Sequence, residues 1–418
     1  MKKVNVLYIG LGARGYGYLK LLLQMEDVEI LGVSDLYADR AEKGAELVES
    51  VRGKRPAVST SYRDLLDIKG LDCVIAPASW TSHTAIALDA MNAGLYAGIE
   101  VGGASSIEEC WELIRTSERT GKPCMMLENC CYGREEMTVL NMIRKGMFGE
   151  LVHCEGGYRH DLRDEVALGH ENRHYRLDNY LNRTGDVYPT HELGPIAKYL
   201  GLNRGNRMVS LTSTASKSVG INDWIKRNKG EDFENAHSHF ALGDVVITVI
   251  KCAHGETITL YHDTSLPRPY SRANLVQGTR GIWSEDKRGV YIDGRSPHGA
   301  SWDPHCWESI DDYFGEFEHP LWREYRDAGV KAGHGGMDYL VQRAFIEAVR
   351  DGVQTPIDVY DTASWMAVTP LSEASINCGS APVAIPDFTN GRWINREAPA
   401  RGKYCLDEVC TEAFAGDA

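Results

Sequence analysis

Three features are missing from the 418-residue sequence, and each absence excludes a class of protein. It has no run of about 18 apolar residues, so we predict no membrane-spanning helix. Basic residues number 45 against 59 acidic ones and form no stripe, so we expect no nucleic-acid partner for a chain with a net charge of −14. The 11 cysteines include no Cys-x-x-Cys pair, so we predict no metal site.

The rest of the composition is that of an ordinary folded protein. Hydrophobic residues make up 43% and charged residues 25% of the chain, and its length favours two or three domains. Because unpaired cysteine is usually buried, we interpret most of the 11 as reduced core thiols, which favours a reducing compartment. The apolar run at residues 4–9 is too short for a signal peptide. We therefore expect a cytoplasmic protein without membrane contact.

The first third of the chain alternates short apolar strands with helices. Strands are predicted at residues 4–9, 28–34, 73–76, 96–100 and 124–127, and helices at 18–24, 38–51, 82–93 and 107–120. This alternation predicts an α/β Rossmann domain with a parallel sheet and right-handed crossovers, over residues 1–130.

The pattern changes in the middle of the chain, where strands follow one another directly. After a helix at 135–145, strands are predicted at 151–158, 208–214, 238–242, 245–252, 257–262, 274–277, 281–284 and 289–292, and helices at 337–350 and 359–378. Successive strands separated by turns predict an α+β domain with a large open antiparallel sheet at 131–380, followed by a C-terminal extension at 381–418. Residues 159–183 are predicted as a long irregular loop, which is usually functional.

A glycine-rich motif follows the first predicted strand. Residues 10–15 read G-x-G-x-x-G between a strand and a helix, the context that dinucleotide binding requires. Gly10 permits the tight turn, Gly12 lets the backbone approach a pyrophosphate, and Gly15 allows close packing. Asp35, 20 residues after Gly15, would bind the adenosine ribose diol and repel a 2′-phosphate, so NAD is favoured over NADP. The alternative is a glycine turn with a capping aspartate.

The segment Trp80-Thr81-Ser82-His83 extends the predicted cofactor site. It follows the strand at 73–76, and ligands of parallel sheets bind at the carboxyl ends of the strands. These residues could line the ribose and the nicotinamide. In the alternative interpretation, Thr81 or Ser82 only caps the helix that follows.

The order of these motifs resembles that of the Gfo/Idh/MocA oxidoreductases, which pair a Rossmann domain with an open sheet. In that family the strand that ends here at Glu100 typically continues with Lys-Pro, and the lysine assists proton transfer at the reacting carbinol. This chain reads Glu100-Val101-Gly102. The missing lysine argues against an ordinary sugar dehydrogenase.

Longer motifs resemble glycoside hydrolase family 109, which contains NAD-dependent N-acetylgalactosaminidases. They lie at residues 128–134, 158–163, 172–176, 188–191, 267–272 and 333–339, and the resemblance extends from the glycine loop to the final helices. Two positions depart from the family pattern. Ala332 stands where the histidine loop commonly has another glycine, and Glu192 stands where a glycine is expected. A carboxylate at residue 192 could change the sugar specificity.

The resemblance implies a role for each candidate site residue. Catalytic roles fall to His334, as the acid and base at the leaving group, and to Tyr158, His191 and Tyr270. Substrate binding falls to Tyr158, Arg176, Tyr188, His191 and Tyr270, and His160 is expected to hold the loop. The cofactor-binding set is Gly10, Gly12, Ala13, Arg14, Gly15, Asp35, Trp80, Thr81, His83, Glu100, Val101, Glu128, Asn129 and Tyr188. On pattern alone, each tyrosine is more often a packed aromatic and His334 a turn residue.

The sequence therefore predicts an NAD-dependent glycosidase similar to the α-N-acetylgalactosaminidases. It would hydrolyse N-acetylgalactosaminides, or a related hexosaminide or galactoside, by oxidation at C3, elimination, addition of water and re-reduction. One alternative is a net NAD-dependent sugar dehydrogenase. Another is a non-enzymatic NAD(H) sensor, which the many His, Tyr and Arg residues at 158–191 disfavour. Because open-sheet relatives often pair through the exposed sheet face, we expect a homodimer.

Overall fold

The computed structural model describes residues 3–296, 306–331, 333–398 and 401–414, and the described chain forms two compact units. The first unit comprises Met1–Gly133, Pro320–Ser364 and Glu397–Ala418, and the second comprises Arg134–His319 and Trp365–Arg396. Segments from the last quarter of the chain thus belong to the same unit as the N-terminal third. Ala332, one of the two departures from the family pattern, lies outside the described residues.

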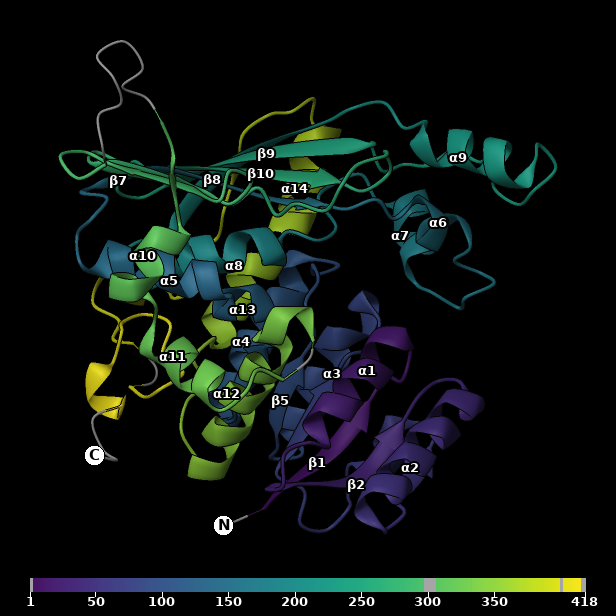
Figure 1. Ribbon diagram of the computed structural model, residues 1–418. Helices are drawn as coiled ribbons and strands as arrows, with labels where there is room; N and C mark the ends of the chain where they lie inside the picture. Colours follow the sequence, from purple (N-terminus) through teal and green to yellow (C-terminus); the bar gives the residue numbers. More distant parts are fainter. Residues whose placement is uncertain (1–2, 297–305, 332, 399–400, 415–418) are drawn as a thin grey trace. The chain divides into compact units, whose positions relative to one another are not determined.

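The first unit contains a six-stranded sheet in which every pair of neighbours is parallel (Figure 1). Its strands are β1 Val4–Ile9, β2 Val28–Ser34, β3 Ala57–Ser59, β4 Cys73–Ala76, β5 Tyr96–Ile99 and β6 Cys124–Met126. Their order is β3-β2-β1-β4-β5-β6, so the direction of winding reverses between β1 and β4. Such a reversal is the switch point at which parallel sheets bind ligands, and the glycine loop directly follows β1. The predicted Rossmann fold is confirmed.

The helices of the first unit pack around this sheet and beside it. They are α1 Ala13–Leu22, α2 Ala38–Arg52, α3 Trp80–Asn92, α4 Ile107–Thr120, α11 Pro320–Asp327 and α12 Met337–Asp351, with short 3-10 turns η1 Tyr62–Leu65, η2 Asn129–Tyr132, η3 His334–Gly336 and η5 Thr411–Phe414. Helix α4 has the predicted bounds because Ser106 accepts a hydrogen bond from the Glu109 amide at its start and Gly121 ends it with φ +68°. Helix α1 begins at Ala13, five residues before the predicted start, because Gly15 and Gly17 hide the helical pattern.

The second unit is built on a nine-stranded sheet (Figure 1). Its strands are β7 Leu151–Arg159, β8 Met208–Ala215, β9 Val245–Cys252, β10 Thr257–Asp263, β11 Leu275–Gly278, β12 Gly281–Ser284, β13 Gly289–Ile292, β14 Glu308–Ser309 and β15 Val383–Ala384, in the order β14-β13-β12-β11-β7-β10-β9-β8-β15. The pairs are antiparallel, as predicted, except that β10 runs parallel to β7. The sheet is therefore mixed, because two strands distant in sequence meet at its centre.

The second unit contains seven helices in its described residues, two of which pack on the sheet. They are α5 Arg134–Arg144, α6 Arg163–Ala167, α7 Arg176–Asn182, α8 Thr190–Tyr199, α9 Gly220–Lys229, α10 Asp311–Phe317 and α14 Val368–Asn377, with the turn η4 Arg392–Ile394, and α13 Val359–Met366 crosses the boundary between the units. Helix α8 packs on β7 and α14 packs on β8. The alternating burial of β9 leaves the opposite face open, with Ile247 and Val249 exposed.

Three predictions for the chain after residue 158 are wrong. Residues 238–242 form no strand, and the predicted loop at 159–183 contains helices α6 and α7. The single helix predicted at 359–378 is two helices. The break falls at Ala367 because Pro370 has no amide hydrogen to donate to the carbonyl of Met366.

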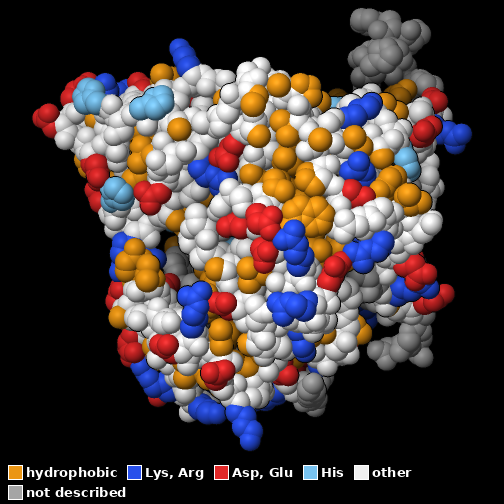
Figure 2. Space-filling model, turned by 180° about the vertical axis from the view of Figure 1, so that it is seen from behind, with side chains coloured by type: hydrophobic (Ala, Val, Ile, Leu, Met, Phe, Trp, Pro, Cys, Tyr) orange, Lys and Arg blue, Asp and Glu red, His pale blue; other side chains and the backbone are white. Residues whose placement is uncertain are grey.

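The cysteines, the helices and the surface charges bear on what the composition predicts. Eight of the 11 cysteines are buried, which confirms that most lie in the core. Among the described residues, no helix is both long and apolar enough to cross a membrane. Acidic and basic side chains are intermingled over the face drawn in Figure 2.

Candidate active site

The glycine loop of the first unit has the form that a dinucleotide site needs. Gly10 has φ +101°, and a Cβ there would lie 2.6 Å from the carbonyl oxygen of Pro77. A Cβ at Gly15 would lie 2.1 Å from the carbonyl oxygen of Gly10. A Cβ at Gly12, in contrast, would meet only the Arg40 guanidinium at 3.7 Å, and Gly12 precedes the first turn of α1. The loop is thus packed tightly at its ends and open at the helix N-terminus, where backbone amides can bind phosphate.

Asp35 ties the end of β2 to this loop. Its carboxylate is buried and accepts hydrogen bonds from the amide of Leu11 at 2.6 Å and the amide of Tyr37 at 2.9 Å. Asp35 therefore holds the shape of the glycine loop. Its predicted contact with the ribose remains a prediction.

The segment after β4 is arranged by backbone contacts. Helix α3 begins at Trp80 with Ser79 as its N-cap and no side-chain cap bond, so the alternative in which Thr81 or Ser82 is the cap is wrong. His83 Nε2 lies 3.1 Å from the carbonyl oxygen of Ala78. Burial lowers the pKa of His83 to about 4, so the ring is neutral and holds this segment in place.

Arg14 is the centre of a polar network within the first unit. Its guanidinium donates to Glu100 Oε1 at 2.8 Å and 3.2 Å, and to the two carboxylate oxygens of Asp338 at 2.5 Å and 3.0 Å. Asn129 Nδ2 donates to Asp338 Oδ1 at 2.7 Å, and His334 Nδ1 lies 2.8 Å from Asp338 Oδ2. The structure thus brings together four predicted site residues, Arg14, Glu100, Asn129 and His334, around an aspartate that sequence reasoning missed.

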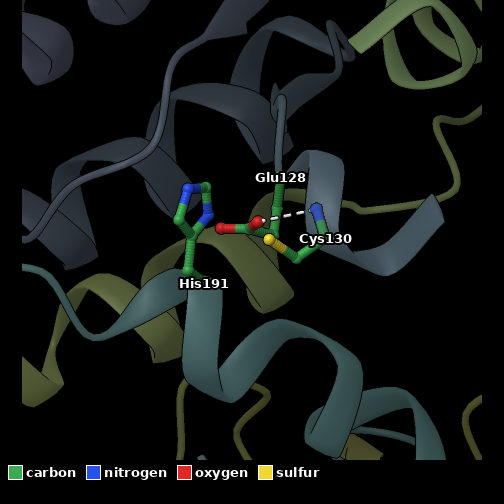
Figure 3. A group of neighbouring side chains, drawn as sticks. All are labelled: Glu128, Cys130 and His191. Carbon is green, nitrogen blue, oxygen red and sulfur yellow. Dashed lines mark hydrogen bonds between the residues drawn. The ribbon is translucent and has the colours of Figure 1, made fainter. Parts of the chain in front are cut away.

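Glu128 and Val101 complete the predicted cofactor residues of this unit. Glu128 is fully buried, and its Oε1 accepts a hydrogen bond from the Cys130 amide at 3.0 Å, as Figure 3 shows. The amide of Val101 donates to Glu100 Oε2 at 3.1 Å. A Cβ at Gly102 would lie 2.3 Å from the Trp80 ring, so this glycine lets Trp80 pack against the end of β5.

In the second unit, four predicted residues form one aromatic and basic cluster. The Tyr158 and Tyr188 ring centroids are 4.3 Å apart, and the His191 ring lies 5.7 Å from Tyr158 and 5.0 Å from Tyr188. The Tyr188 hydroxyl lies 3.2 Å from His191 Nε2. The Arg176 guanidinium carbon lies 5.7 Å from the Tyr158 centroid and 5.3 Å from the Tyr188 centroid. All four side chains are at most 9% exposed, so their polar groups interact in a site with little water.

The elements of the second unit explain why these residues meet. Tyr158 lies on the covered face of β7, two positions from buried Gly156. Tyr188 and His191 flank the start of α8, which packs on β7. Arg176 begins α7, in the segment that was predicted to be irregular.

Tyr270 stands at the edge of this cluster. It is 51% exposed, whereas Tyr158 is 7% exposed. The His160 ring stacks with Tyr158 at 6.0 Å and meets Tyr270 edge-on at 5.2 Å. His160 thus lies between Tyr270 and the buried Tyr158 ring and contacts both.

Two further side chains of this cluster were missed by sequence reasoning. Glu165 Oε1 forms an ion pair with Arg176 Nε at 2.8 Å. His262 is fully buried beside Tyr158, and neither of its ring nitrogens has a hydrogen-bond partner among the described residues. Burial and Arg176 lower the pKa of His262 to about 3, so this ring is neutral. The strand alternation at 257–262 could have placed His262 on the covered face, whereas no sequence pattern pairs Glu165 with Arg176.

Glu192 occupies a fully buried place in α8. A Cβ at Gly156 of β7 would lie 3.0 Å from its carbonyl oxygen and 3.1 Å from its Cα and Cβ atoms. Gly156 therefore allows α8 to approach β7 closely at Glu192. Any influence of this carboxylate on sugar specificity remains a prediction.

Comparison with known families covers both units of the chain. Residues 132–395 match the family model described as glycosyl hydrolase 109, C-terminal domain, and residues 4–128 match the NAD-binding Rossmann fold of the oxidoreductase family. An alpha-N-acetylgalactosaminidase of Tannerella forsythia is 40% identical and covers 93% of this chain and 87% of its own. A glycosyl hydrolase family 109 protein of Stenotrophomonas maltophilia is 39% identical, and the match covers 95% of this chain and 91% of that protein.

The chain belongs to glycosyl hydrolase family 109. The family assigned from the sequence motifs is confirmed, and membership makes the protein a glycoside hydrolase with an NAD-binding Rossmann domain. Among solved structures, a myo-inositol 2-dehydrogenase from Lactobacillus plantarum superposes with a TM-score of 0.65 at 15% identity, covering 92% of this family 109 chain and 100% of its own. At that identity the likeness shows a shared fold.

Proposed function

We propose that the protein hydrolyses N-acetylgalactosaminides, or a related hexosaminide or galactoside, in the cytoplasm with bound NAD as its catalytic cofactor. Relatives in Tannerella forsythia and Shewanella oneidensis carry the name alpha-N-acetylgalactosaminidase. The observation that supports the proposal most directly is the buried cluster of Tyr158, Tyr188 and His191 around Arg176. A cluster of proton-carrying groups is what elimination chemistry on a sugar ring requires.

The residues of the first unit fit NAD. The open backbone at Gly12 and the N-terminus of α1 would take the pyrophosphate, and Asp35 would take the adenosine ribose diol. Trp80, Glu100 and Glu128 would line the nicotinamide half. When bound, NAD would supply the oxidation at C3 of the sugar and the matching reduction at the end of the cycle.

The remaining steps fall to side chains of the chain itself. A ketone at C3 makes the C2 proton acidic, so a base can remove it while the bond from C1 to the leaving oxygen breaks. Tyr158 would accept this proton, because its hydroxyl lies 3.5 Å from the Arg176 guanidinium, which stabilises negative charge on the phenol oxygen. His191, whose Nε2 lies within hydrogen-bond distance of the Tyr188 hydroxyl, would take the proton of the C3 hydroxyl during the oxidation and give it back during the reduction. Tyr158, after exchanging its proton with solvent, would return a proton to C2 once water has added to C1.

Two other residues would act on the leaving group and on the part of the substrate at the edge of the cluster. His334 would protonate the leaving oxygen and then deprotonate the incoming water, since its ring is about half exposed. Tyr270, also half exposed, would contact substrate at the edge of the cluster. Protons and electrons balance over one turnover, so the products are the free sugar and the aglycone with no net oxidation.

A screen of aryl α- and β-glycosides tests this function. We expect the purified protein, without added NAD, to cleave an N-acetylgalactosaminide or a close relative, and to leave deuterium at C2 of the product when the reaction is run in D₂O. NADH should not accumulate. Stoichiometric NADH together with an oxidised sugar would instead identify a sugar dehydrogenase, and a product with fully retained C2 hydrogen would identify direct displacement.

A further inference from the structure

Asp338 lies at the base of the His334 side chain within the first unit. It belongs to the first turn of α12, four residues after His334, and is only 2% exposed. Its Oδ2 lies 2.8 Å from His334 Nδ1, while the His334 side chain is 56% exposed. A buried carboxylate therefore contacts one nitrogen of an exposed imidazole.

Three further hydrogen bonds keep Asp338 negatively charged. Arg14 donates to both carboxylate oxygens, and Asn129 donates to Oδ1. Burial alone would raise the pKa of Asp338, but the hydrogen bonds from His334 and Arg14 outweigh it and hold this pKa well below its ordinary value. Asp338 therefore remains an anion at neutral pH and can only accept a hydrogen bond from the imidazole.

Arg14, in contrast, would favour the tautomer in which His334 Nδ1 carries no proton and accepts a hydrogen bond. Its Nη1 lies 3.1 Å from His334 Nδ1 and can only donate. The carboxylate is closer, at 2.8 Å, and Arg14 Nη1 already donates to Asp338 Oδ2 at 2.5 Å. The hydrogen bond between His334 Nδ1 and Asp338 is therefore the stronger of the two contacts, and the proton is favoured on Nδ1.

We propose that Asp338 is a positioning residue that keeps a proton on Nδ1 of His334 and so makes Nε2 the atom that exchanges protons. In general, a buried carboxylate can fix both the tautomer and the orientation of a catalytic imidazole. The identity of the group that exchanges its proton with Nε2, the leaving oxygen, rests on the proposed function. The tautomer does not.

The glycine before the histidine makes this contact possible. A Cβ at Gly333 would lie 3.0 Å from both Cβ and Oδ2 of Asp338. The backbone at Gly333, with φ +106°, therefore passes directly over the carboxylate. Gly333 thus leaves room for the Asp338 carboxylate, which in turn orients the His334 ring.

The tautomer can be measured directly by NMR on the full-length protein with ¹⁵N-labelled histidine. The His334 signals are assigned by their loss in His334→Gln. We expect the neutral ring to carry its proton on Nδ1 in the unmodified protein and to lose that preference in Asp338→Asn. A neutral ring protonated on Nε2 in the unmodified protein would overturn the inference, and this measurement needs only the His334→Gln variant, used for the assignment, to fold.

Asp27→Asn is the matched control. Asp27 is also a buried carboxylate of the first unit, and it pairs through both oxygens with Arg343 of the same helix α12, at 2.6 Å and 2.7 Å. Because the side-chain partners of Asp27 among the described residues are Arg343 and Arg350 and include no histidine, its loss should leave the His334 tautomer unchanged. A tautomer change in Asp27→Asn equal to that in Asp338→Asn would show a general loosening of the unit and overturn the positioning role.

Kinetics separate this inference from the proposed function. If His334 is the leaving-group acid, Asp338→Asn should lower kcat on glycosides with poor leaving groups by about 10²- to 10⁴-fold, with little change in KM and a smaller loss on nitrophenyl glycosides. An equal loss on both substrates, with the NMR result as expected, would leave the Nδ1 proton assigned to Asp338 but would overturn the acid role of His334.

Discussion

At the scale of single residues, His334 and Tyr158 are proposed to act at different bonds of the substrate, so their variants should differ in leaving-group dependence. A general acid contributes about 10²- to 10⁴-fold when the leaving oxygen is basic and little when it departs unaided. We therefore expect His334→Ala to be severe on alkyl glycosides and mild on nitrophenyl ones. Tyr158→Phe should harm both alike, because proton removal at C2 is needed for every substrate. Equal losses on both substrates for His334→Ala would move the acid role elsewhere, most directly to His191.

Asp35 combines a structural and a recognition role that two variants can separate. Its carboxylate accepts backbone hydrogen bonds from Leu11 and Tyr37 and would also bind the ribose diol. We expect NAD to co-purify, and Asp35→Ala to reduce the preference for NAD over NADP by about 10- to 100-fold, since each hydrogen bond to a charged group is worth about 1.5–3 kcal/mol. Asp35→Asn keeps one backbone acceptor and removes the charge, so it should change the preference with less loss of stability. Equal affinity for both cofactors in the unmodified protein would contradict this role.

Site residues in local sequence motifs could be predicted, whereas those whose partners come from other elements could not. Gly10 and Asp35 lie in a local motif whose spacing follows from backbone geometry, so the sequence alone pointed to them. His334 was singled out only because its glycine loop resembles a family motif. Glu165 and Asp338 were missed because their partners, Arg176 and Arg14, come from other elements and meet them only in the folded chain. The His334 to Asp338 spacing of four residues was the one available signal, and it becomes meaningful only once α12 is known to begin at Met337.

At the scale of elements, strands and helices with strong periodicity were predicted well, and those shaped by tertiary packing were not. Helix α4 matches its prediction because both of its caps are local. Helices α6 and α7 are short, at 5 and 7 residues, so their helicity depends on packing that no local pattern encodes. The parallel pairing of β7 with β10 joins strands about 100 residues apart, beyond the reach of any local signal.

The loop before α12 offers a test with a control two residues away. Gly333 and Gly335 both have positive φ, at +106° and +66°, but a Cβ at Gly333 would lie 2.6 Å from Leu21 and 3.0 Å from Asp338, whereas nothing lies within 4 Å at Gly335. We expect Gly333→Ala to strain the loop by about 1–3 kcal/mol and to lower turnover at least about tenfold, with a lower Tm. Gly335→Ala should be markedly milder in both measurements. Equal effects would show that backbone conformation, and not the contact with Asp338, limits the loop.

At the scale of the whole molecule, the open face of the nine-stranded sheet is where we expect a second copy of the chain to bind. Ile247 and Val249 of β9 are 41% and 44% exposed on this face. Tyr261 and Thr259 of β10 stand opposite them in register, so apolar and hydroxyl side chains alternate across neighbouring strands. A surface of this kind can form a self-complementary interface, and a stable one would bury about 1,200–2,000 Å² in total.

Replacing both exposed residues tests the homodimer. Light scattering after size exclusion, over a range of concentrations, should give a dimer for the unmodified protein and a monomer for the Ile247→Lys, Val249→Lys double variant, because two buried ammonium groups on each copy would face each other across the interface. Val353→Lys changes an equally exposed apolar residue, at 48%, in the first unit and should leave the dimer intact. An unchanged Tm at the lowest concentration would show that the double variant still folds. A dimer that survives the double substitution would place the contact on another surface, and a monomeric unmodified protein would contradict dimerisation itself.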